Sequence, residues 1–312
     1  MNVKFYLQKL KELKVKSPAK TTSRENHPSF KIPCLNSLNT LSPALASKLT
    51  LTVFSMPRRY RKRDEEHAFL EQGTPLSIHA DNREIAAWRW GSGPSVLLVH
   101  GWSGCAAQFH RMAAQIVSAG FSVVAFDQPG HGASPGTTSN LLKFNRALEA
   151  MDRFHGPFHA VIGHSLGGLS LAMVAAENGL SDRLVLINPI PSVAYAIESF
   201  SQIVNLPQNL SDSLWSTVRK RFGIIPDETS FANLVDDIAS DTLVIHEKHD
   251  RQIPWKLTEE WASTWDSATF ETTEGLGHQR ILSDEKTIER IVDYIGKPRV
   301  DIRAQVLSEY AL

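Results

Sequence analysis

The six residues 163–168, GHSLGG, place a serine between two glycines with the spacing G-x-S-x-G. This spacing is typical of a sharp strand-to-helix turn that presents a serine hydroxyl as a nucleophile. A serine hydroxyl is a weak nucleophile at neutral pH, so it needs a base, and the base needs a carboxylate that orients it. The pentapeptide alone is a weak signal, and the rest of the chain must supply both partners of Ser165.

Two later segments supply an acid and a base. Asp250 ends the apolar run TLVIHEKHD, and His278 lies in EGLGHQR, just after the run ATFETTE. Ser165, Asp250 and His278 therefore each follow an expected strand. In such a set the imidazole takes the proton of the serine hydroxyl, and the carboxylate holds the imidazole in the productive tautomer. The three residues predict acyl-transfer chemistry.

The same chemistry needs an oxyanion hole. Attack on a carbonyl creates a negatively charged oxygen, which two backbone N–H groups stabilise. The amide of Leu166 begins the helix expected after the serine and lies at its positive end. The second amide is expected from Trp102, immediately after the run SVLLVHG.

Other polar residues are weaker candidates for these roles. Glu247 lies inside its strand, and Asn188 cannot serve as the carboxylate. His164 is expected to point away from the site, because side chains alternate along a strand. His131, in DQPGHGAS, fits a turn. A metal pair made with His246 is disfavoured, because the spacing HEKH puts its two histidines on opposite faces of an extended strand.

The elements that must hold these residues are short apolar runs separated by longer mixed stretches. The runs are rich in Val, Ile and Leu with little alternation, as in strands that are buried on both faces. They are SVLLVHG (95–101), SVVAFD (122–127), HAVIGHS (159–165), RLVLINP (183–189) and TLVIHEKHD (242–250). Stretches such as 106–119 and 166–178 are long enough for helices. The pattern predicts an α/β fold with a mostly parallel, doubly wound sheet, whose carboxyl edge carries the candidate residues.

Two further features divide the chain. PLSIHA and EIAAWRW flank Asp81-Asn82, which predicts a β-hairpin. About fifty residues between RLVLINP and TLVIHEKHD contain three segments with helical spacing, AYAIESFSQIV, SDSLWSTVRKRFG and SFANLVDDIA. We expect residues 190–240 to form a small helical cap, and residues 64–189 and 241–312 to form the core.

The beginning of the chain has a different composition. Residues 1–63 hold 14 Lys and Arg against 2 Asp and Glu, whereas the remaining 249 residues hold 19 against 31. We expect a flexible basic extension, which could make weak electrostatic contact with an anionic surface but no specific contact with nucleic acid. Because MPRRYRKRDEEHAFLEQG would be a natural opening for the predicted α/β core, Met56 is an alternative start of the protein.

The composition also bears on location. Cys34 and Cys105 are too few for a disulfide framework, which favours a reducing compartment. The sequence has no run of eighteen apolar residues and no secretory signal at its beginning. We therefore expect a cytoplasmic protein.

Taken together, the segments HGWSG, FDQPGHGAS, GHSLGG, HEKHDRQIP and GLGHQR resemble the α/β-hydrolase superfamily over roughly residues 75–297. The resemblance implies Ser165 as nucleophile, Asp250 as acid, His278 as base, the amides of Trp102 and Leu166 as oxyanion donors, and no cofactor or metal. Haloalkane dehalogenases and epoxide hydrolases are similar but carry an aspartate at the position of the serine, which excludes both. Hydroxynitrile lyases and cofactor-free haloperoxidases can share a serine triad.

These features predict a serine esterase that cleaves small-molecule carboxylic esters through an acyl-enzyme. Apolar residues of the expected cap, Phe200, Trp215 and Phe231, suit a small or medium acyl group better than a long lipid chain. A thioesterase, lactonase or carbon–carbon bond hydrolase with the same triad is the alternative. A small-molecule receptor with little turnover is a further alternative from another class.

Overall fold

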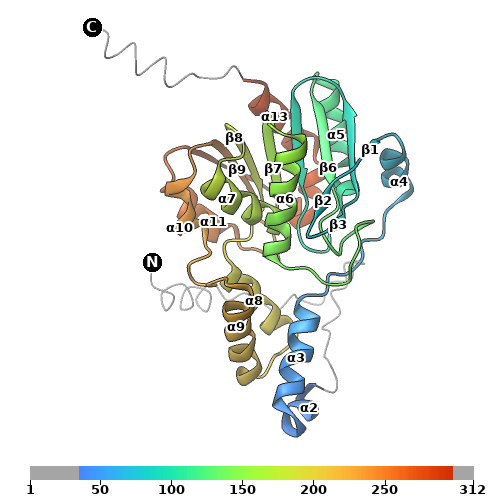
Figure 1. Cartoon of the computed structure of the whole chain (residues 1–312). Coiled ribbons are helices and arrows are strands. Elements are labelled where there is room, and N and C mark those ends of the chain that lie inside the picture. The colour runs from blue at the N-terminus through green and yellow to red at the C-terminus, as the bar shows by residue number, and fades with distance from the viewer. Residues whose placement is uncertain (1–34, 298–312) are drawn as a thin grey trace.

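A sheet of eight strands forms the centre of the molecule in the computed structural model, which describes residues 35–297 (Figure 1). The strand order is β1-β4-β6-β5-β7-β8-β9-β10. The strands are β1 (Thr74–Leu76), β4 (Ala87–Gly91), β5 (Ser95–Val99), β6 (Ser122–Phe126), β7 (Ala160–His164), β8 (Arg183–Ile187), β9 (Asp241–Glu247) and β10 (Ala268–Thr273). The β1–β4 and β4–β6 pairs are antiparallel, and the other neighbouring pairs are parallel. The prediction of a mostly parallel α/β sheet is confirmed.

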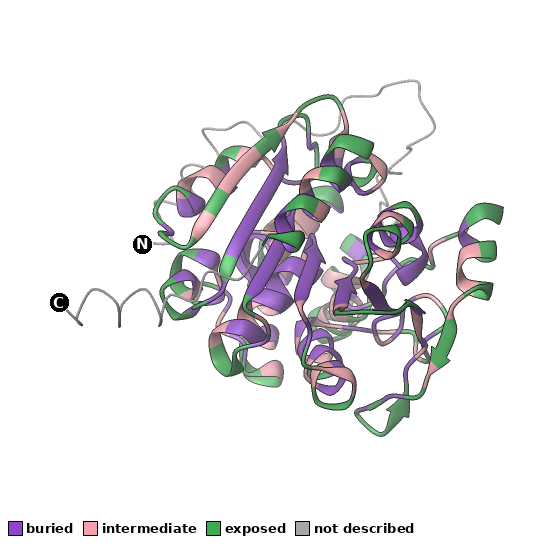
Figure 2. Cartoon of the chain, turned by 90° about the horizontal axis from the view of Figure 1, so that it is seen from above, coloured by how far each residue is buried: buried purple, intermediate pink, exposed green. Residues whose placement is uncertain are grey.

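Alternate residues of the strands feed two apolar cores. In β5, Val96 and Leu98 belong to one core, whereas Leu97 and Val99 belong to the other. Helices α5 and α13 contribute to the first core, and α6, α7 and α11 contribute to the second. The bounds of these helices are α5 (His110–Ser118), α6 (Leu141–His155), α7 (Leu166–Asn178), α11 (Trp255–Ala262) and α13 (Glu285–Gly296). Figure 2 shows the result, with buried central strands and exposed outer faces of the helices.

Side chains at the helix starts explain where two of these helices begin. The Asn140 side chain accepts a hydrogen bond from the amide of Lys143 at the start of α6, and the Asp284 side chain accepts one from the amide of Thr287 at the start of α13. Helix α7 ends at Gly179, whose φ of 64° favours glycine.

The predicted β-hairpin is present as β2 (His79–Ala80) and β3 (Arg83–Glu84). Asp81 and Asn82 between them have φ angles of 49° and 58°. Two successive left-handed residues form the turn whose twist matches that of a two-residue hairpin, and Asp and Asn tolerate this region well.

The segment between β8 and β9 forms three helices. They are α8 (Val193–Ile203), α9 (Gln208–Phe222) and α10 (Phe231–Leu234), with a 3-10 turn at Val235–Asp237 after the last. Helices α8 and α9 lie beyond the sheet, whereas α10 packs against α7 and α11 (Figure 1). Helix α8 begins where the Ser192 side chain accepts a hydrogen bond from the amide of Tyr195. The segment SFANLVDDIA forms only the short helix α10 and the 3-10 turn, although its apolar spacing predicts a longer helix.

The expectation of a flexible extension over residues 1–63 is wrong for the described part, residues 35–63. Helix α3 (Pro43–Phe54) packs against α9, with α2 (Leu35–Leu41) beside it (Figure 1). Leu35, Ala46 and Leu210 bury their side chains in this contact, and the rings of Phe54 and Phe200 lie 5.2 Å apart. Apolar residues within the basic segment thus find partners more than 140 positions further along the chain.

The basic residues that follow α3, 57–63, also contact the rest of the protein. The amide of Arg58 donates to Ser103 Oγ at 2.9 Å, and helix α4 (Asp64–Glu71) places Phe69 in a stack on Trp90, with ring centroids 4.2 Å apart. Residues 1–34, which include Cys34, lie outside the described residues. Within 35–297, no helix combines the length and apolar character that a membrane crossing requires.

Candidate active site

Ser165 lies between β7 and α7 in a strained conformation. Its φ and ψ are 54° and −120°, which a residue with a side chain rarely adopts. The flanking glycines permit this turn: a Cβ on Gly163 would lie 2.8 Å from the Cα of Gly168, and a Cβ on Gly167 would lie 2.5 Å from the carbonyl oxygen of Val99. The turn therefore has the geometry of a nucleophile elbow. Ser165 keeps 9% of its surface exposed, so it is not sealed in the interior.

Asp250 and His278 are directly hydrogen-bonded. Nδ1 of His278 donates to Oδ2 of Asp250 at 2.6 Å. The other carboxylate oxygen accepts from the amides of Gln252 and Ile253, at 2.8 and 3.0 Å. Burial alone would raise the pKa of Asp250, but the charge of His278 and hydrogen bonds from His246 and His278 lower it well below its usual range. A carboxylate that stays ionised fixes the imidazole with Nε2 as its free nitrogen.

His278 lies beside the nucleophile turn. The His164 ring, immediately before Ser165, lies 4.7 Å from the His278 ring between centroids, and its Nε2 donates to the carbonyl oxygen of His278 at 2.9 Å. The expectation that His164 points away from the site is therefore wrong. Burial, with the charge of His278, lowers the pKa of His164 to about 3, so it is a neutral donor.

The loop after β5 lies against Ser165. A Cβ on Gly101 would lie 2.8 Å from the Cβ of Ser165, so the backbone that leads to Trp102 is in contact with the serine. His100 fixes this loop: its Nδ1 donates to the carbonyl oxygen of Gly101 at 2.7 Å, and its Nε2 accepts from the amide of Gln128 at 2.9 Å. Burial lowers the pKa of His100 to about 4, which is consistent with a neutral ring.

The two predicted oxyanion donors directly follow Gly101, which contacts Ser165, and Ser165 itself. The amides of Trp102 and Leu166 donate no hydrogen bond to another residue within 35–297. Leu166 is the first residue of α7, and the first amides of a helix have no partner within the helix. Both amides are thus without a hydrogen-bond partner among the described residues, and their role as oxyanion donors stays a prediction.

His131 has a structural environment. It is buried, its Nδ1 donates to the carbonyl oxygen of Pro129 at 3.1 Å, and its ring lies 5.2 Å from that of Trp102. The turn that contains it is held by Asp127, whose two oxygens accept from the amides of Ala106 and Ala133, each at 2.7 Å.

The residues of HEKH occupy different environments. His246 is buried, with Nδ1 beside Thr258 Oγ1 at 2.8 Å and Nε2 beside the carbonyl oxygen of Ile253 at 3.0 Å. The side chain of His249 is 62% exposed. Within residues 35–297, no cluster of three or more His, Cys, Asp or Glu side chains could hold a metal ion. Cys105 is buried, which raises the pKa of its thiol to about 12.

Three residues that sequence reasoning set aside support the base. Besides His164, the Asn188 side chain donates to the carbonyl oxygen of His278 at 3.2 Å, and Glu247 accepts hydrogen bonds from the backbone just before His278. Their partners lie 29 to 114 positions away in the chain. No spacing rule in the sequence links such distant residues.

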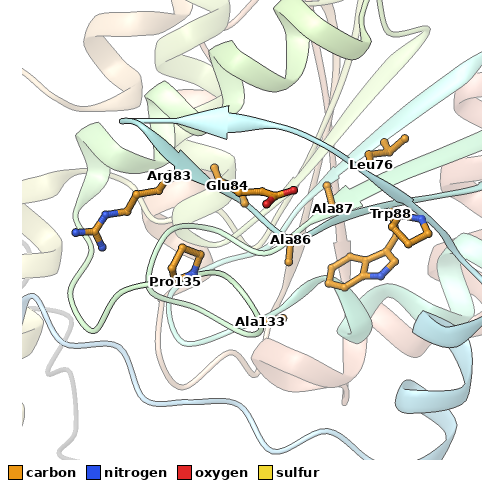
Figure 3. Close-up of a pocket in the computed structure, with 10 residues that line it drawn as sticks. Leu76, Arg83, Glu84, Ala86, Ala87, Trp88, Ala133 and Pro135 are labelled. Atoms are coloured by element: carbon orange, nitrogen blue, oxygen red, sulfur yellow. The ribbon is translucent and has the colours of Figure 1, made fainter.

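A cavity of about 560 Å³ lies elsewhere, at the antiparallel edge of the sheet. Arg83, Trp88 and Pro135 are among its lining residues (Figure 3). It contains none of Ser165, Asp250 or His278 and therefore does not extend the candidate site.

Comparison with known proteins gives the family. The family model described as serine aminopeptidase, S33, matches residues 93–276, more than half of the chain. The chain belongs to this family. The resemblance to the α/β-hydrolase superfamily is thereby confirmed.

Curated relatives carry several activities. The chain is 29% identical over 130 residues to a non-heme haloperoxidase of Rhodococcus erythropolis, covering 40% of this chain and 47% of that protein. It is 32% identical over 136 residues to the pimeloyl-[acyl-carrier protein] methyl ester esterase of Chromobacterium violaceum, covering 43% and 46%. The matched part of the chain thus spans about half the length of these relatives.

Solved structures share the fold. An esterase from Exiguobacterium antarcticum has a TM-score of 0.57 at 17% identity, covering 72% of this chain and all of that one. A membrane phospholipase A has a TM-score of 0.56 at 18% identity and covers 95% of this chain and all of that one. At these identities the likeness shows the fold alone.

Proposed function

We propose that this protein is a serine hydrolase of carboxylic esters with Ser165 as nucleophile, His278 as base and Asp250 as the orienting acid. The observation that carries the proposal is the 2.6 Å hydrogen bond from His278 Nδ1 to Asp250 Oδ2, together with the contact of His278 with His164, the residue before a serine in a strained turn. The esterase among the curated relatives supports ester chemistry.

The proposed reaction has two halves. His278 Nε2 takes the proton of the Ser165 hydroxyl while the oxygen attacks the ester carbonyl, and the amides of Trp102 and Leu166 stabilise the resulting oxyanion. The alcohol leaves with the proton from His278. A water molecule, deprotonated by the same imidazole, then attacks the acyl-enzyme and releases the acid. His278 carries out every proton transfer in both halves of the proposed reaction.

The helices between β8 and β9 are proposed to limit the size of the acyl group. The amide of Ile190, at the start of this segment, donates to the carbonyl oxygen of Ser165 at 3.3 Å, so the cap begins at the nucleophile. Phe231 is fully buried against Trp261, and Phe200 packs on Phe54, so these two rings make packing contacts with other parts of the protein. The proposed preference for small to medium acyl groups therefore depends on the covering helices as a whole.

The first experiment is turnover of p-nitrophenyl acetate and butyrate by the wild type and Ser165→Ala. We expect the variant to lose at least about 10³-fold in kcat/KM, because the nucleophile is removed while the fold is kept. Full activity of a folded Ser165→Ala variant would refute the proposal.

A substrate panel separates the related activities. Matched oxygen esters, thioesters, lactones and amino-acid p-nitroanilides should be compared by kcat/KM on the same enzyme. We expect the highest value for an oxygen ester. A thioester or lactone that exceeds every oxygen ester would transfer the proposal to that bond, and tight ligand binding without turnover of any substrate would indicate a receptor.

A further inference from the structure

The side chain of Glu247 connects the acid segment with the base segment. Glu247 is the last residue of β9, three positions before Asp250, and its side chain is completely buried. Its Oε2 accepts a hydrogen bond from the amide of Gly277 at 2.8 Å, and its Oε1 accepts one from the amide of Leu276 at 3.2 Å. These two amides immediately precede His278.

The backbone of this loop is shaped for an anion. Leu276 is in the right-handed helical region, with φ −96° and ψ −35°, and Gly277 is left-handed, with φ 69°. A right-handed residue followed by a left-handed one directs successive N–H groups into one concavity that binds anions. In this protein the carboxylate of Glu247 fills the concavity.

The other side of His278 is held by the same network. Its carbonyl oxygen accepts from Asn188 Nδ2 at 3.2 Å and from His164 Nε2 at 2.9 Å. The Asn188 side chain also accepts from the backbone amide of Glu247 at 2.8 Å. The backbone on both sides of the imidazole is therefore fixed by buried groups at the ends of β7, β8 and β9.

Asp250 and Glu247 have separate tasks in this geometry. Asp250 contacts the imidazole ring, whereas both oxygens of Glu247 contact backbone amides. Hydrogen bonds with a charged acceptor are about twice as strong as neutral ones, so two of them hold the loop firmly. Loss of this hold would move the imidazole relative to both Asp250 and Ser165.

We propose that Glu247 is a positioning residue for His278, which holds the Leu276–Gly277 backbone so that the imidazole keeps its alignment with Asp250 and Ser165. This inference rests on the proposed serine-hydrolase function. It assigns to a buried carboxylate a role in the reaction that the triad alone does not include.

The test is Glu247→Gln in the full-length protein. Glutamine has the same shape, but its NH2 group would face a backbone N–H, so one of the two hydrogen bonds is lost. We expect kcat on p-nitrophenyl butyrate to fall about 100-fold with KM within about twofold, because a displacement near 1 Å costs about that factor. The downfield proton resonance of His278 Nδ1–H should shift or broaden. Rescue is tested with Glu247→Asp, which keeps the charge but is shorter, and kcat between those of wild type and Glu247→Gln is expected.

The matched control is Glu274→Gln, the same substitution at a side chain that is 65% exposed beside the same loop. We expect it to have wild-type kcat and an unchanged His278 resonance. A folded Glu247→Gln variant with wild-type kcat and resonance would overturn the inference. If neither Glu247 variant folds, the residue serves the fold and the inference is likewise wrong.

The two proposals fail in different ways. A fluorophosphonate that does not label Ser165 in the wild type would refute the proposed function. A labelled and active wild type together with a fully active Glu247→Gln variant would refute the positioning role alone.

Discussion

His100, His131 and His164 predict that the protein loses stability as the pH falls below 6.5. Burial lowers the pKa of His100 to about 4, and burial together with a neighbouring imidazole lowers those of His131 and His164 to about 3, from an ordinary value of 6.5. Between pH 6.5 and 4 the unfolded chain therefore binds protons that the folded protein does not. The free energy of unfolding therefore decreases as the pH is lowered across this window.

The size of the effect is set by the pKa differences. At pH 5 each of the three imidazoles lowers the free energy of unfolding by about 2 kcal/mol, or about 6 kcal/mol together. Burial raises the pKa of Asp127, which opposes this loss, because the folded protein then binds a proton more readily. The pKa of Asp250 is lowered, so its contribution is lost only below its ordinary value, outside the window. A loss of this size approaches the whole stability of an ordinary domain.

Urea unfolding followed by tryptophan fluorescence at pH 7 and pH 5 measures this loss. His131→Phe, which cannot titrate, should show a pH dependence smaller by about 2 kcal/mol. Equal free energies of unfolding at the two pH values in the wild type would refute the reasoning that these histidines are buried and neutral.

Three further predictions concern the reaction and the cap. Asp250→Asn should lower kcat by about 10⁴-fold at pH 7, because an asparagine stabilises the wrong tautomer of His278; a loss below about tenfold would contradict the assignment. His278→Ala should lower kcat about as much as Ser165→Ala, because the nucleophile and its base act as a unit, and a loss below about tenfold would contradict its role as base. A chain that begins at Met56 lacks α2 and α3, so it should expose the apolar surface around Leu210 and have a lower Tm and faster proteolysis within residues 190–240 than the full chain. Identical Tm and proteolysis would show that these helices do not stabilise the cap.

The strands and their order along the chain could be predicted because each is a short apolar run between turn residues. The expected run SVVAFD and the observed β6 (Ser122–Phe126) agree within one residue, and the stretch 166–178 is helix α7. Ser165 could be assigned to the carboxyl edge because its glycines meet a local steric requirement. Local chemistry was sufficient in each of these cases.

The packing of distant segments could not be predicted in the same way. Helix α3 lies within a basic segment, and the sequence gives no sign that Ala46 meets Leu210 on α9. The hydrogen bonds of Glu247 to Leu276 and Gly277 depend equally on strand neighbours that only the fold brings together. The composition of a segment indicates how polar it is, whereas the residues it packs against are determined by the tertiary structure.

The basic extension shows how composition misleads. Its charge suggested a flexible arm, yet Arg58 donates through its backbone to Ser103, next to Trp102 in the candidate oxyanion loop. The backbone amide of an arginine binds as that of any residue does, and net charge carries no information about it.

The most direct measurement of the central claim is mass spectrometry of the protein after treatment with a fluorophosphonate. The account predicts one covalent adduct, on the peptide that contains Ser165, formed much more slowly in a His278→Ala variant. Ester turnover by a protein whose adduct lies on another residue, or that forms no adduct, would contradict it.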